Sequence, residues 1–245
     1  MTREYEEASR RITEGKRVIA LTGAGVSVES GIPDFRSEDG IWSKYPPYEY
    51  ATIDAFIRNP EKVWSLWFEL GGMMEGVTPN PGHLALAELE ELGHLHAVIT
   101  QNIDNLHQEA GNTNVIEYHG NTKRIVCLRC HTARPLDITK EQRPGPRCAC
   151  GEYMKPDVVL FGETIPHRAL LESEALARSC DVILIVGTSA QVFPAAGLPF
   201  TAKDAGAYVI ECNVEPTEFT RTITDAFLQG PSGESLPRLV NWVRR

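Results

Sequence analysis

Short apolar runs recur along the chain and alternate with segments of helical pattern. The runs are residues 17–22, 96–100, 114–119, 158–161, 181–187 and 207–212. They contain few polar positions, so we expect strands that are buried on both faces. Segments between them, such as 82–93 and 168–180, have apolar residues at helical spacing. Strands alternating with helices predict an α/β fold with a doubly wound parallel sheet, and six strands would make that sheet Rossmann-like.

Two long segments interrupt the alternation. Residues 37–81 are rich in aromatic side chains, and residues 122–157 contain four of the six cysteines. Both are too long for ordinary loops, so we expect them to form a smaller second lobe with a helical module and a zinc ribbon. The predicted division is a Rossmann-like, NAD-binding domain and a small domain. The first comprises 1–36, 82–121 and 158–245, and the second comprises 37–81 and 122–157.

Composition and charge narrow the function classes. The chain has 245 residues, of which 42% are hydrophobic and 23% charged, as is usual for globular proteins that dissolve in water. No apolar run approaches the roughly 20 residues of a membrane span. The opening residues, MTREYEEASRR, lack the apolar centre of a signal peptide, so we expect a cytoplasmic protein without a membrane partner. A net charge of −9 argues against direct binding to nucleic acid.

Four cysteines are clustered with metal-ligand spacing. Cys127 and Cys130 form one pair, and Cys148 and Cys150 form a second pair 17 residues later. In a cytosolic chain this pattern favours a metal site over disulfides. Four thiolates complete a tetrahedral zinc shell and leave no open position, which indicates one structural zinc ion. Four free thiols are the alternative, and His131 could replace one ligand.

The glycine-rich stretch LTGAGVSVESGIPDFR, residues 21–36, follows the first apolar run. Its glycines fit neither the usual dinucleotide fingerprint nor a P-loop. A strand that runs into a glycine turn still places backbone N–H groups where a phosphate can bind. Asp34, Phe35 and Arg36 follow, and their functional groups suit the reactive end of a ligand better than its adenosine end.

Polar residues follow several of the predicted strands. Gln101, Asn102 and Asp104 follow the second run, and His119 ends the third. Parallel strands end at one edge of a sheet, where open α/β folds bind ligands. Asn and Asp also occur there as helix caps, and a lone histidine is often structural, but several polar strand ends at one edge favour a site. After the later strands come Gly187, Thr188, Ser189 and Asn213.

Seven stretches of the chain resemble the ordered signatures of the sirtuins, which are NAD-dependent protein deacylases. They are GAGVSVESGIPDFR, TQNIDNLH, EYHGN, CLRC…CAC, KPDVVLFGE, GTSAQVFPAAGLP and CNVEP. They occur in the family's order and cover most of the chain. The departures are the single residue between Cys148 and Cys150, and Ala190 where a larger apolar residue is common.

This resemblance implies that NAD is consumed as a co-substrate. Gly23 and Ala24 would hold the pyrophosphate, and Asp34, Phe35 and Arg36 would cover the nicotinamide half. Asn102, Ile103 and Asp104 would hold the nicotinamide carboxamide, and His119 would act as general base for a ribose hydroxyl. Asn102 and Asp104 would be catalytic residues together with His119. Further NAD contacts are expected from Gln101, Gly187, Thr188, Ser189, Asn213, Val214 and Ser232.

The resemblance also implies the second substrate, a protein or peptide that carries an acyl-lysine. The peptide would lie between the stretches VVLFGE and GTSAQVFP, both of which look strand-like. Val159, Phe161, Gly162 and Val192 would contact it. In sirtuins that remove acidic acyl groups, a tyrosine and an arginine meet the acyl carboxylate, and Trp67 and Leu70 occupy those positions here.

Two other functions remain open at this stage. Transfer of ADP-ribose from the same NAD site would depend less on His119, and a non-catalytic NAD sensor would bind NAD without releasing nicotinamide. Asn102, Asp104 and His119 together disfavour the sensor. The sequence does not indicate the oligomeric state.

Overall fold

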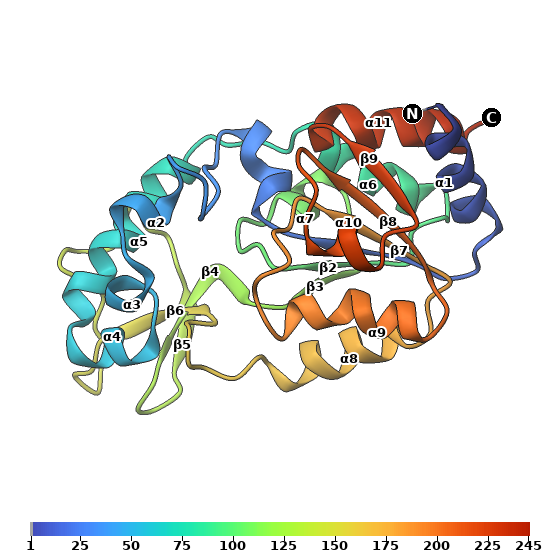
Figure 1. Ribbon diagram of the computed structural model, residues 1–245. Coiled ribbons are helices and arrows are strands. Elements are labelled where there is room, and N and C mark those ends of the chain that lie inside the picture. Colours follow the sequence, from blue (N-terminus) through green and yellow to red (C-terminus); the bar gives the residue numbers. More distant parts are fainter. Residues whose placement is uncertain (1) are drawn as a thin grey trace.

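The computed structural model describes residues 2–245, which form a large and a small lobe (Figure 1). The large lobe is built on a six-stranded sheet of order β3-β2-β1-β7-β8-β9, in which all pairings are parallel. This confirms the predicted fold class. The strands are β1 (Val18–Thr22), β2 (Ala97–Thr100), β3 (Val115–Glu117), β7 (Val182–Val186), β8 (Tyr208–Asn213) and β9 (Ala226–Gln229).

Helices cover both faces of this sheet, which explains why its strands are mostly apolar. In β1, Val18 and Ala20 join one apolar cluster, and Ile19 and Leu21 join the cluster on the opposite face. Side chains that alternate between two buried faces leave few polar positions in the strand. The first face packs against α1 (Thr2–Glu14), α6 (Pro81–Glu91) and α11 (Ser232–Val243), and the second against α8 (His167–Ala177) and α9 (Leu198–Asp204).

Short helices follow the carboxyl ends of four strands and shape the edge at which the site lies. They are η1 (Ala24–Ser30) after β1, α7 (Leu106–Ala110) after β2, η2 (Ala195–Gly197) after β7 and α10 (Glu218–Thr222) after β8. No helix within residues 2–245 is long and apolar enough to cross a bilayer.

The small lobe combines a helical module with a three-stranded antiparallel sheet of order β5-β4-β6. Trp64, which is fully buried, donates a hydrogen bond from Nε1 to the carbonyl of Met154 at 2.9 Å and so joins the two parts. The helices are α2 (Ile41–Lys44), α3 (Pro47–Tyr50), α4 (Ile53–Arg58) and α5 (Pro60–Met74), and the strands are β4 (Gly120–Cys127), β5 (Ala133–Pro135) and β6 (Met154–Val158).

One of the six predicted strands was wrong. Residues 158–161 are not in the large sheet, because only Val158 is in a strand, and that strand is β6 of the small lobe. The segment is apolar for another reason, since Val158 and Leu160 are buried in the small lobe's core. The sixth strand of the large sheet is β9, which the pattern of apolar runs did not reveal.

Candidate functional site

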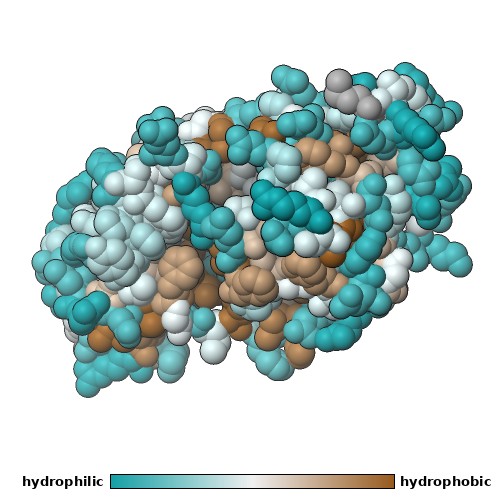
Figure 2. Space-filling view, viewed as in Figure 1, coloured by the Kyte–Doolittle hydropathy of each residue, from teal (hydrophilic) through white to brown (hydrophobic). Residues whose placement is uncertain are grey.

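A cavity of about 1300 Å³ lies where the two lobes meet, at the carboxyl edge of the large sheet. Figure 2 shows apolar side chains gathered around the middle of the molecule, with hydrophilic surface on either side. All the predicted NAD and substrate residues line this cavity. They are Gly23, Ala24, Asp34, Phe35, Arg36, Gln101, Asn102, Ile103, Asp104, His119, Val159, Phe161, Gly162, Gly187, Thr188, Ser189, Val192, Asn213, Val214 and Ser232.

The glycines at one end of the cavity are required by the packing of two strand-end loops. The Gly25 N–H donates to the carbonyl of Gly187 at 2.8 Å, and the Gly23 N–H donates to Val186 at 3.0 Å. Gly187 has a φ of +58°, and a Cβ there would lie 2.4 Å from the nitrogen of Val26. Any larger residue would push the loops apart, so these glycines keep backbone close to backbone at the edge of the sheet.

A hydrogen-bonded chain orients the polar residues that follow β2. The Asn102 amide donates from Nδ2 to the carbonyl of Gly23 and to Oγ of Ser27, each at 3.1 Å. Ser27 in turn donates to Oδ2 of Asp104 at 2.7 Å, and Oδ1 of Asp104 accepts the N–H of Leu106 at 3.0 Å. Asn102 and Asp104 are therefore fixed to the glycine loop through Ser27.

The imidazole of His119 is held in one tautomer. Its Nδ1 lies 3.1 Å from the carbonyl oxygen of Gln101. A carbonyl can only accept, so Nδ1 carries the proton and Nε2 is the basic nitrogen. Burial lowers the pKa of His119 from its ordinary value of 6.5, although the hydrogen bond to Gln101 acts in the opposite direction. The ring is thus neutral near pH 7.

The segment after η1 forms another wall of the cavity. Oδ1 of Asp34 accepts the N–H groups of Arg36 and Ser37, each at 2.8 Å, and so closes a tight turn. Burial acts to raise the pKa of Asp34, but these N–H groups outweigh it and the pKa is lowered. Phe35 packs on Trp42 with a ring-centroid distance of 4.9 Å. The turn thus holds an aromatic ring at the cavity while Asp34 remains ionised.

The end of the cavity near β7 and β8 is polar. Asn213 donates from Nδ2 to the carbonyl of Thr188 at 3.0 Å, and Gln101 donates from Nε2 to Oγ1 of Thr188 at 3.1 Å. Ser232, the first residue of α11, lies 3.3 Å from Oε2 of Glu29 through its hydroxyl. The first two contacts join the ends of β2, β7 and β8, and the third joins the start of α11 to η1.

The small lobe supplies the apolar side of the cavity. Trp67 and Leu70 of α5 line it and are almost fully buried, with 7% and 8% of their surface exposed. Met73 and Met74 extend the same lining. None of these four side chains carries a charge, so this wall suits an apolar chain.

The stretches predicted to hold the peptide line the cavity, but they are not regular strands. We call residues 158–163 the substrate segment. Phe161 makes an isolated parallel bridge with Thr52, and residues 187–194 form turns and bends. The strand-like appearance of both stretches was misleading, because Val159, Phe161 and Val192 line a cavity, and Val158 and Leu160 pack in the small lobe's core.

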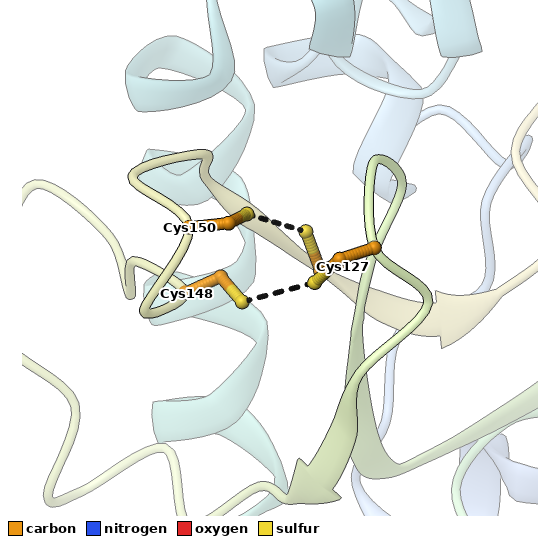
Figure 3. Close-up of side chains that lie close together, drawn as sticks. Cys127, Cys148 and Cys150 are labelled. Atoms are coloured by element: carbon orange, nitrogen blue, oxygen red, sulfur yellow. Dashed lines mark hydrogen bonds between the residues drawn. The ribbon is translucent and has the colours of Figure 1, made fainter.

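The four cysteine sulfurs converge at the tip of the small lobe. Figure 3 shows Cys127 at the end of β4 facing Cys148 and Cys150 on the opposite turn. All four Sγ atoms lie within 4.8 Å of one another, with 3.5 Å between Cys127 and Cys150 and 3.4 Å between Cys130 and Cys148. Tetrahedral zinc with bonds of about 2.3 Å would place sulfurs about 3.8 Å apart, so the residues fit this ion.

Two residues of the polar network were not predicted. Ser27 joins Asn102 to Asp104, and its hydroxyl also lies 3.4 Å from Nε2 of His83. Ser27 is part of the glycine-rich stretch, where a serine beside glycines was the available signal. His83 is within α6, and nothing in its local sequence indicated a contact with η1.

These observations define a class: a Rossmann-like protein that binds a nucleotide at its sheet edge and closes the site with a metal-binding lobe. The family model described as the Sir2 family matches residues 23–194. An NAD-dependent protein deacylase of Pyrococcus abyssi is 47% identical over 98% of each chain. NAD-dependent protein deacylase 2 of Archaeoglobus fulgidus is 46% identical over all of this chain and 98% of its own length. The chain belongs to the Sir2 family.

Solved structures of Sir2 proteins agree with this placement. A Sir2 homologue in complex with NAD is 43% identical, superposes with a TM-score of 0.92, and covers 98% of this chain and 93% of its own. Sir2Af2 bound to a myristoylated histone peptide is 40% identical with a TM-score of 0.85, and covers 100% of this chain and 98% of its own.

Proposed function

We propose that the cavity removes acyl groups from protein lysines, with NAD as a co-substrate that is cleaved to nicotinamide and ADP-ribose. The acyl group passes from lysine to the ADP-ribose. One observation carries the proposal: a neutral His119 lies in the same cavity as the amide and carboxylate that follow β2 and the glycine loop. The NAD complex of a Sir2 homologue and the names of the relatives support NAD as the co-substrate.

Asn102 and Asp104 are suited to hold the nicotinamide carboxamide. Both amide hydrogens of Asn102 are used, one toward Gly23 and one toward Ser27. Asn102 can therefore act toward a ligand only as an acceptor, through Oδ1. That oxygen and the carboxylate of Asp104 match the NH₂ of a carboxamide, and Ile103 lies between them. Gripping this amide out of the ring plane would weaken the bond to the ribose.

His119 is suited to act as general base. Its Nε2 is unprotonated and its pKa is lowered by burial, so it can take a proton from a ribose hydroxyl near neutral pH. The activated hydroxyl would attack the carbon of the acyl group after nicotinamide has left. Phe35, which is held on Trp42, would shield this step from water.

The remaining roles follow the position of each residue around the cavity. Gly23 and Ala24 would hold the pyrophosphate. Gln101, Gly187, Thr188, Ser189, Asn213, Val214 and Ser232 would hold the adenosine half, Asp34 and Arg36 would close over the nicotinamide half, and Val159, Phe161, Gly162 and Val192 would contact the acylated peptide.

The cysteine site would be structural and lie outside the reaction. A zinc ion there is closed by four sulfurs and would join the turn at 127–130 to the turn at 148–150. We propose a domain division in which 37–81 and 122–157 form the bulk of the small domain, and Val158 and Leu160 add to its core. A cytoplasmic location is proposed because reduced thiols persist there.

The test is product analysis with acetyl-lysine peptides. The protein, an acetylated peptide and NAD should yield free lysine, nicotinamide and acetylated ADP-ribose in equal amounts by mass spectrometry, and none without NAD. A peptide that gains the mass of ADP-ribose would favour ADP-ribosyl transfer instead. NAD binding without nicotinamide release would favour the sensor.

A further inference from the structure

Lys155 and Glu163 form an ion pair at the base of the substrate segment. The Nζ atom of Lys155 lies 2.9 Å from Oε2 of Glu163, with 4% and 22% of the two side chains exposed. A lysine is seldom buried so deeply unless its charge is compensated. Lys155 belongs to β6 of the small lobe, and Glu163 ends the substrate segment. The ion pair therefore connects the strand that precedes the substrate segment with the last residue of the segment.

The lysine is saturated by this arrangement. An ammonium group has three hydrogens to donate, and Nζ donates to the carbonyls of Pro156 and Val158 in addition to Glu163. Val158 is the first residue of the substrate segment. Lys155 thus fixes the position of the Val158 carbonyl, at the start of the substrate segment.

Glu163 fixes the other end of the substrate segment. Its Oε2 accepts the N–H of Leu160 at 2.8 Å, while its own N–H donates to the carbonyl of Leu160 at 3.0 Å. These two bonds close a turn that requires Gly162, whose φ is +91°. We call Lys155 and Glu163 together the clasp.

The substrate segment needs such support because it is a thin wall. One side lines the main cavity, and a second cavity of about 580 Å³ lies behind it, lined by Lys155, Val158, Val159 and Glu163 among others. Val158 and Leu160 anchor the segment in the small lobe's core, but Val159 and Phe161 line the cavity and are less tightly packed. Its other backbone supports include the N–H of Val159, which donates to the carbonyl of His119, and the N–H of Phe161, which donates to the carbonyl of Ala51, both at 2.8 Å, and the carbonyl of Phe161, which accepts the N–H of Ile53 at 3.0 Å.

We propose that the clasp is a positioning element for the acylated peptide. It fixes the backbone of the substrate segment in the conformation that binds the peptide. Lys155 does not line the main cavity, so it would act through the segment rather than by contact with the peptide. Without it, the segment would have to be ordered when the peptide binds, and that entropic cost would weaken binding. The inference rests on the proposed function, since it assumes that this segment contacts the peptide.

The experiment measures peptide affinity apart from turnover. Binding of a fluorescent acetyl-lysine peptide is followed by anisotropy, NAD binding by calorimetry, and kcat by nicotinamide release. Lys155→Met should raise the peptide Kd by roughly tenfold or more, with NAD affinity unchanged and kcat altered less. Glu163→Gln is the milder variant, since glutamine can still accept from Leu160 and Lys155, and it should raise the Kd several-fold. In the double variant, the loss of peptide-binding free energy should be smaller than the sum of the losses in the two single variants.

The matched control is Glu141→Gln. Glu141 pairs with Arg134 in the small lobe, its side chain is 10% exposed, and neither residue lines either cavity. It should lower thermal stability without changing the peptide Kd. If the clasp variants fold but bind peptide within twofold of the parent, the inference is wrong, as it is if Glu141→Gln raises the Kd equally. If the parent binds peptide but releases no nicotinamide, the proposed function fails and the inference about the clasp does not.

Discussion

The two lobes are stabilised in different ways. The large lobe has an apolar cluster on each face of its sheet, and every residue of β1 is 1% exposed or less. The small lobe has one cluster around α5 and a sheet whose edge strand, β5, has three residues. Its distal end holds the four cysteines, of which Cys130 and Cys150 are exposed. The large lobe is therefore stabilised by its core, whereas the small lobe has a smaller core and a cysteine cluster that could hold a metal ion between two of its turns.

The largest expected effect follows from removing that metal. Cys127→Ala, or a strong chelator, should eliminate one zinc ion per chain, unfold the tip of the small lobe and abolish deacylation. Hydrogen exchange should then become fast in β4, β5 and β6 but stay slow in β1, β7 and β8. Cys180→Ala, a buried cysteine of the large lobe, is the control and should retain zinc. Full activity in metal-free protein would contradict the prediction.

The second largest effect is expected from a substitution in the large lobe that leaves the metal site intact. His119→Ala should lower kcat roughly 10²–10⁴-fold, the usual contribution of a positioned general base, with NAD affinity and zinc content retained. His167→Ala, at the exposed start of α8, should behave like the parent. Activity of His119→Ala within a few-fold of the parent would remove this residue from the mechanism.

The third prediction concerns the apolar wall that the small lobe presents to the large one. A succinyl group buried beside Trp67 and Leu70 meets no cationic side chain on this wall, so its removal should be roughly 10²-fold slower than removal of acetyl from the same peptide. Myristoyl should be accepted, because the flanking methionines adapt to apolar chains. Leu70→Arg should narrow the gap between succinyl and acetyl, and Leu70→Met should not. Equal parent rates on both acyl groups would refute this account.

The smallest effect is a pH dependence of stability that originates in the large lobe. His83 and His107 are buried together with ring centroids 4.9 Å apart, and burial lowers their pKa values from 6.5 to about 4 and about 3. The unfolded chain protonates these rings first, so their contribution is complete above pH 6.5 and is lost as the pH falls toward 4. For His83 the shift corresponds to something on the order of 3 kcal/mol.

Urea unfolding at several pH values checks this prediction. His83→Gln should flatten the dependence, whereas His96→Gln, at an exposed position, should leave it unchanged. A parent protein that is equally stable at pH 7 and at about pH 5 would show that the two rings titrate normally.

The sequence predicted the large lobe better than the surfaces between the lobes. Strands β1, β2, β7 and β8 were evident because burial on both faces leaves continuous apolar runs. The substrate segment looked the same, since an apolar residue facing a cavity cannot be distinguished locally from one facing a sheet. β9 was missed because only part of its short sequence, AFLQ, is buried.

The distinction between local pattern and tertiary contact also explains which site residues the sequence predicted and which it did not. Residues at strand ends could be assigned to one edge from topology alone, and all of them line the cavity. The contacts of Ser27 with Asn102 and Asp104 join segments that are distant in the sequence, and the clasp depends on an irregular local turn. Lys155 and Glu163 are eight positions apart, with no regular element that would bring them together, so only the folded chain reveals their pairing.

The pairing of β1 with β7 has a consequence for how the chain acquires its structure during synthesis. Val18 lies opposite Val182, 164 positions later, and both strands are central in the sheet. The first half of the sheet and both segments of the small lobe therefore leave the ribosome before the central partner of β1 exists. A contact of such long range forms slowly, and until it forms one edge of β1 is unpaired and open to association with other chains. Nascent protein should thus depend most on chaperones just before residue 182 emerges.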